Sequence, residues 1–93
     1  LYFSELLGAN LETVPKVERA RLGLENGVRI GKITQRGLIS RMGIGEGFIV
    51  LAVNKKPISK PQELAAMLEK ISGRVIIEGI TAEGQRGYYS FIF

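Results

Sequence analysis

Alternation of apolar and polar residues divides the chain into short segments that predict strands. Leu7, Ala9 and Leu11 alternate with polar or small residues, so one face of that segment is expected to be buried. The segments with strand character are residues 6–14, 28–33, 48–53, 74–80 and 87–93. Residues 48–53 are almost wholly apolar, which predicts a strand buried on both faces. Residues 82–85 separate the last two segments and predict a hairpin turn.

Three other segments predict helices. The longest is residues 60–71, where Ser59 is expected to cap the N-terminus and Glu63 supports the first turn. Its apolar residues recur at helical spacing and are Leu64, Ala65, Met67, Leu68 and Ile71. Residues 16–22 and 38–42 predict short helices, because a glycine follows each of them.

The order of these elements predicts an α+β fold that is mainly β. Strands and helices do not alternate strictly, which argues against a parallel doubly wound sheet. We expect a partly open β-barrel or sandwich of five to six strands, capped by one long helix at about 60–71 and by one or two short helices. Residues 1–4 are interpreted as a tag remnant or linker, and residues 5–93 as a single domain.

The composition excludes several kinds of catalytic site. The chain has no Cys, His or Trp, and all nine of its acidic residues are glutamate. A Ser-His-Asp triad, a Cys-His pair and a zinc site of the usual His/Cys type therefore cannot be built from it. We expect no catalytic residues, no metal site and no cofactor. A Ser-Lys or Glu-Glu pair would be needed for an enzyme, and no such pair stands out.

The positive charge does not predict a nucleic-acid partner. Thirteen Lys and Arg against nine Glu give a net charge of +4, but the basic residues are spread along the chain and interleaved with Glu. Only Lys55, Lys56 and Lys60 form a cluster, so a solvated surface explains the pattern better than a phosphate track. No apolar run approaches the roughly 20 residues of a membrane span, and no integral membrane segment is expected.

Four segments form an ordered series of motifs: residues 27–33, 37–44, 47–58 and 59–68. This series resembles the PDZ domain family, and more narrowly the PDZ domains of HtrA/Do-type (DegP/DegQ-like) bacterial serine proteases. The sequence departs from the family pattern at three places: Leu38-Ile39-Ser40 replaces Ser-Pro-Ala, Phe48 replaces an Asp, and Lys55 replaces a Gly. These departures suggest the second, C-terminal PDZ domain of such a protease.

The resemblance implies a peptide site with three parts. A loop of Glu5, Leu6, Leu7 and Gly8 would bind a peptide carboxylate through its backbone N–H groups. An edge strand of Ala9, Asn10, Leu11, Glu12 and Thr13 would pair with the peptide by strand addition. Pro61, Ala65 and Leu68 would wall the groove, while Leu64, Met67 and Ile71 would pack inward.

The expected function is therefore that of a binding module. The resemblance implies that a His at the start of the helix would bind a ligand Ser or Thr, and this chain has no His. We therefore expect preference for apolar C-terminal or extended segments, as in unfolded substrates. The resemblance further implies a parent protease with its triad in another domain, a homo-oligomer, and protein quality control in the periplasm or cell envelope.

Two alternatives stay open at this point. The domain could be structural, contacting neighbouring subunits of the protease oligomer with an unused groove. Residues 88–93 predict a last strand, but they could instead form a tail that docks into a neighbouring groove.

Overall fold

The computed structural model describes residues 2–93, and it confirms the expected fold class. Its elements are β1 (Tyr2–Ser4), β2 (Ala9–Thr13), α1 (Lys16–Leu22), β3 (Val28–Ile33), α2 (Leu38–Met42), β4 (Ile49–Val53), β5 (Lys56–Pro57), α3 (Pro61–Lys70), β6 (Arg74–Ile80) and β7 (Arg86–Ile92). The strands form one antiparallel sheet in the order β1-β2-β3-β4-β6-β7, and β5 pairs with β4.

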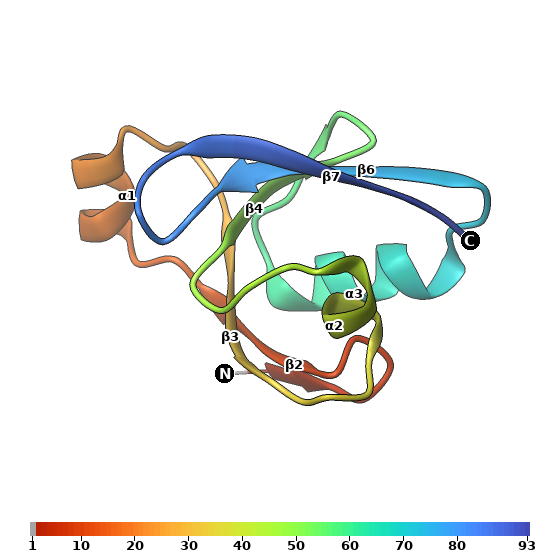
Figure 1. Cartoon of the computed structure of the whole chain (residues 1–93). Coiled ribbons are helices and arrows are strands. Elements are labelled where there is room, and N and C mark those ends of the chain that lie inside the picture. The colour runs from red at the N-terminus through yellow and green to blue at the C-terminus, as the bar shows by residue number, and fades with distance from the viewer. Residues whose placement is uncertain (1) are drawn as a thin grey trace.

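The sheet is strongly bent. In Figure 1, β6 and β7 run across the top, β2 lies at the bottom, and α2 and α3 occupy the space between these two ends of the sheet. All the predicted strands and helices are present, with ends that differ by up to three residues. The final segment is a strand that pairs with β6 along its whole length, so the predicted last strand is confirmed and the docking tail is not.

Two strands had not been expected. β5 follows a tight turn at Asn54 and Lys55, which both have positive φ, and only its two residues pair with β4. β1 is formed by Tyr2–Ser4, within the segment interpreted as a tag remnant or linker. The described part of the chain therefore has seven strands instead of five to six.

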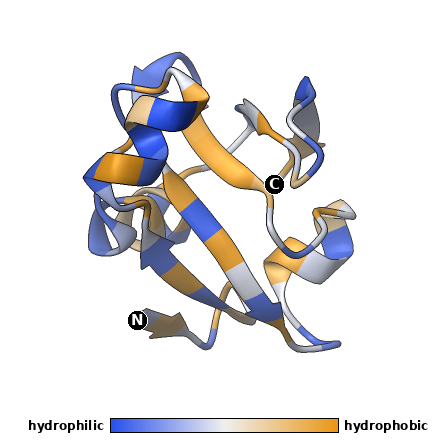
Figure 2. Ribbon diagram, turned by 90° about the vertical axis from the view of Figure 1, so that its left-hand side faces the viewer, coloured by the Kyte–Doolittle hydropathy of each residue, from blue (hydrophilic) through white to orange (hydrophobic). Residues whose placement is uncertain are grey.

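Apolar side chains from the sheet and from two helices make the main core. The strands place Leu11, Ile30 and Val50 fully inside it, and α3 contributes Leu64. In Figure 2, a strand that alternates orange and blue stands beside one that is orange throughout, as the sequences of β3 and β4 require. Burial of this apolar surface is the main force that holds the bent sheet to the helices.

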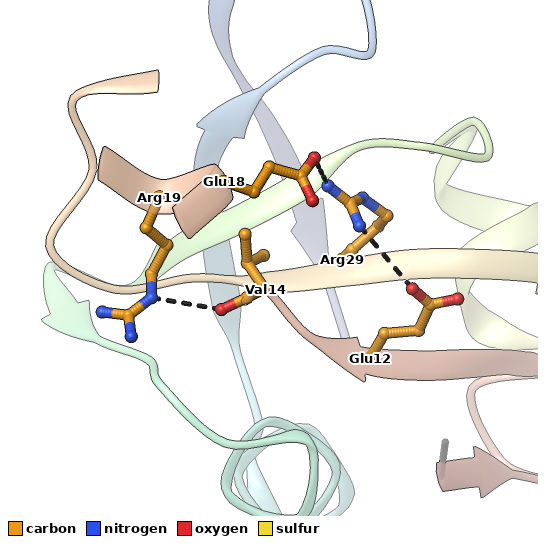
Figure 3. Close-up of polar contacts among 5 residues, drawn as sticks. All are labelled: Glu12, Val14, Glu18, Arg19 and Arg29. Atoms are coloured by element: carbon orange, nitrogen blue, oxygen red, sulfur yellow. Dashed lines mark hydrogen bonds and ion pairs between the residues drawn. The ribbon is translucent and has the colours of Figure 1, made fainter. Parts of the chain in front are cut away.

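Polar contacts attach α1 to the sheet. Arg29 on β3 pairs with Glu12 on β2 and with Glu18 on α1, as Figure 3 shows. The Arg19 side chain donates hydrogen bonds to the carbonyl oxygens of Val14 (3.1 Å) and Glu25. α1 has no buried residue, so these contacts and not apolar packing hold it in place.

None of the helices in residues 2–93 has the length and apolar character needed to cross a bilayer.

Candidate functional site

The loop of Glu5–Gly8 is the tight connection between β1 and β2. The carbonyl oxygen of Ser4 accepts a hydrogen bond from the N–H of Gly8 (2.8 Å), and the Ser4 hydroxyl accepts one from the N–H of Leu7 (3.2 Å). Ser4 is the one buried polar residue among those described. Two of the N–H groups expected to receive a peptide carboxylate are thus turned towards a single residue of β1.

The carbonyl groups of this loop are held on its opposite side. The N–H groups of Leu38 and Ile39, at the start of α2, donate to the carbonyl oxygens of Leu6 and Leu7 at 3.1 and 3.0 Å. The N–H and hydroxyl of Thr34 both donate to the carbonyl of Gly8. The carbonyl groups of the loop are thus held by α2 and Thr34, while the N–H groups of Leu7 and Gly8 are held by Ser4.

Two glycines allow this approach. Gly8 has φ +67, and a methyl group built on it would lie 2.7 Å from the Cα of Gly37. A methyl group on Gly37 would lie 2.5 Å from the Cα of Gly8 and from the carbonyl oxygen of Leu7. Only residues without a side chain permit the loop to reach the start of α2.

β2 provides the edge expected to pair with a peptide, but β1 already lies along part of it. The register places Tyr2 opposite Leu11, Phe3 opposite Asn10, and Ser4 opposite Ala9. This differs from the expectation of an open edge over residues 9–13. Glu12 and Thr13 have no partner in the described part of β1.

Of the residues expected to wall the groove, Pro61 lines the hollow between β2 and α3, whereas Ala65 and Leu68 lie in the same core cluster as Leu64. Pro61, Ala65 and Leu68 are buried, and β1 contacts α3 as well as β2. Leu64 packs in the core as expected, whereas Met67 and Ile71 are only partly buried at its margin.

A hollow of about 500 Å³ is lined by Tyr2, Glu12, Thr13, Pro61 and Gln62, between the far end of β2 and the first turn of α3.

The first turn of α3 is capped by a carboxylate. Glu63 accepts hydrogen bonds from the N–H groups of Ser59 (3.0 Å) and Lys60 (3.4 Å), so Lys60 occupies the N-cap position instead of Ser59. The hydrogen bond from Ser59 is the main cause that lowers the pKa of Glu63 below its ordinary value of 4.5. This cap fixes the end of the helix that borders the hollow.

Two arginines beside the loop were not identified from the sequence. Arg36 and Arg41 line a second hollow of about 490 Å³ together with Glu5 and Leu6. Their side chains bring positive charge to the side of the loop that adjoins α2, where Glu5 also lies. Their sequence signal is weak, because both fall among evenly scattered basic residues.

Within residues 2–93, no three side chains of the metal-binding types cluster. Polar and apolar side chains both line the hollow at the end of the groove, and the expectation of no catalytic residue, metal or cofactor stays a prediction.

A bent antiparallel sheet, a long helix beside the outer edge of β2, and a glycine-containing loop at the start of that strand define the PDZ fold. The crystal structure of the HtrA3 PDZ domain bound to a phage-derived ligand (FGRWV) matches this chain with a TM-score of 0.74 and 19% sequence identity. The match covers 92% of this chain and 81% of that one, and it shows a shared fold. No family model matches the chain, and no curated protein matches it in sequence.

Proposed function

We propose that this chain is a non-catalytic, peptide-binding PDZ module of an HtrA/Do-type bacterial serine protease. It would recognise apolar C-terminal or extended segments by strand addition to β2, for protein quality control. The parent would be a homo-oligomer in the periplasm or cell envelope, with its catalytic triad in another domain. We also propose that the chain is the second, C-terminal PDZ domain of that parent.

One observation carries this proposal: the outer edge of β2, next to α3, accepts an antiparallel strand. β1 occupies that edge with its carboxyl end at the loop of Glu5–Gly8. A peptide whose terminal carboxylate enters this loop must run in the same direction, because the loop precedes the start of β2. The shared fold with a ligand-bound PDZ domain supports the same use of the groove.

Peptide binding by the chain tests the proposal. Fluorescence anisotropy would compare a labelled FGRWV peptide having a free carboxylate with the same peptide amidated at its C-terminus. We expect binding of the free acid and at least about tenfold weaker binding of the amide, because the loop N–H groups stabilise a charged terminus. No binding at millimolar peptide, or preference for peptides with Ser or Thr near the terminus, would contradict it.

The second candidate is a structural domain that contacts neighbouring subunits of the parent, and one observation favours it. β7 is the last strand of the sheet, and only one of its seven residues is charged. Two of its apolar side chains are largely exposed, Tyr88 at 71% and Ile92 at 66%. A long apolar edge strand of this kind pairs readily with another chain. Sedimentation of the chain and of a Tyr88→Lys/Ile92→Lys variant would test it, because self-association through β7 must be lost in the variant.

A further inference from the structure

We infer that β1 is an internal occupant of the peptide groove, so that a peptide can pair with β2 only when β1 leaves. This inference rests on the proposed function and concerns the regulation of the same site. Its first basis is position. Ser4, Phe3 and Tyr2 face Ala9, Asn10 and Leu11, which are the first three residues of the strand assigned to the peptide.

The polar contacts of β1 are those expected of a ligand end. The carbonyl oxygen and the hydroxyl of Ser4 accept hydrogen bonds from Gly8 and Leu7, the N–H groups that would receive a carboxylate. A peptide terminus and Ser4 therefore compete for the same donors. An N–H group already engaged by a buried acceptor cannot bind a second one without losing the first.

The side chains of β1 also alternate as those of a ligand would. Ser4 is 5% exposed and Tyr2 is partly buried against the core, while Phe3 points outward and is 49% exposed. Tyr2 lies beside Pro61 and Gln62 at the first turn of α3. Both the strand and the helix surfaces of the groove are thus in contact with β1.

The contacts of β1 with β2 and α3 are few enough for β1 to dissociate and bind again. It is three residues long, and its central side chain is half exposed. A short edge segment of this kind opens locally at far lower cost than global unfolding. The measured affinity for a peptide is then the affinity of the open groove multiplied by the fraction of molecules in which β1 has left.

A reversible disulfide tests this directly in the full chain. The protein has no cysteine, and Phe3 and Asn10 are opposite each other in the register, so Phe3→Cys/Asn10→Cys can lock β1 to β2. We expect the oxidised protein to bind labelled FGRWV at least about tenfold more weakly than the same protein after reduction. Equal affinities in the oxidised and reduced states would overturn the inference.

A second variant tests the inference by favouring the state in which β1 has left the groove. Tyr2→Ser removes the side chain that packs β1 against the core, and it is expected to raise the affinity for FGRWV by about tenfold. Val17→Ser, at a position of α1 that is 79% exposed, serves as the control and should leave the affinity unchanged. An affinity for the Tyr2→Ser protein no higher than that of the control would also overturn the inference.

The two proposals fail in different ways. If the reduced and Tyr2→Ser proteins bind no peptide at millimolar concentration, peptide binding itself is refuted, and its regulation with it. If the reduced, Tyr2→Ser, oxidised and parent proteins all bind FGRWV with the same affinity, peptide binding stands and control by β1 is refuted.

Discussion

The carbonyl oxygen of Ser4 lies 2.8 Å from the backbone nitrogen of Gly8, and this hydrogen bond places the end of β1 at the loop that opens β2. The Ser4 hydroxyl reinforces it by accepting the N–H of Leu7. A polar residue in an otherwise apolar interior is thus satisfied by the loop to which we assign carboxylate binding.

Removal of the Ser4 hydroxyl is expected to weaken the attachment of β1. Ser4→Ala leaves the N–H of Leu7 without its acceptor, which should lower the free energy of unfolding by about 1–3 kcal/mol. Urea denaturation measures this. Ser90→Ala, at an exposed position of β7, is the control and should change stability by less than about 0.5 kcal/mol. Equal effects of the two substitutions would refute the structural role of the hydroxyl.

The contact between Gly8 and Gly37 predicts a strong effect of a single methyl group. Gly8→Ala combines a positive φ with overlap against Gly37, and it should destabilise the protein by about 2–4 kcal/mol. Gly43 has a similar φ of +80 but open space around it, so Gly43→Ala should cost only about 1 kcal/mol. Thermal melts of both variants would show the difference, and similar melting temperatures would contradict the close approach.

Arg29 predicts a salt-dependent contribution to stability. It pairs with Glu12 and Glu18, so Arg29→Met should destabilise the protein by about 1 kcal/mol at low salt and by less at 1 M salt. Arg21→Met replaces an exposed arginine of α1 and is the matched control. A cost for Arg29→Met that does not change with salt would mean that packing of the side chain, not its charge, is responsible.

The cap of α3 predicts a dependence on pH. The pKa of Glu63 is lowered by its hydrogen bonds, so the stability that its carboxylate contributes is present above the ordinary pKa of 4.5 and is lost as the pH falls through the lowered value. The difference in melting temperature between the parent and Glu63→Ala should therefore shrink on acidification from pH 7 to pH 3. Glu63→Gln keeps an acceptor and should show less pH dependence than the parent. A constant difference between the parent and Glu63→Ala would contradict this cap.

Much of the fold could be predicted from local pattern. The alternation in β3, the apolar run of β4 and the helical stripe of α3 identify elements that bury one face or two. The glycines that end the two short helices adopt the left-handed conformation expected of them. These features depend on residues near one another in the chain, so the sequence shows them directly.

The state of the groove could not be predicted in this way. Three residues are too few to show a period, and β1 is a strand only because β2 and α3 lie beside it. The arginines at the loop are brought there by the contact of α2 with Leu6 and Leu7, which no local pattern indicates. The loop leads directly into β2 and α3 contacts that strand, but β1 covers part of its edge.

The most direct test of the account is to map where a peptide binds. Backbone amide shifts of the labelled full chain would be followed by NMR as unlabelled FGRWV is added. We predict that the largest changes fall in Leu7–Thr13 and in the face of α3 at Ala65 and Leu68, together with loss of hydrogen-exchange protection in Tyr2–Ser4. Changes confined to β7, or binding at β2 that leaves Tyr2–Ser4 unaltered, would contradict it.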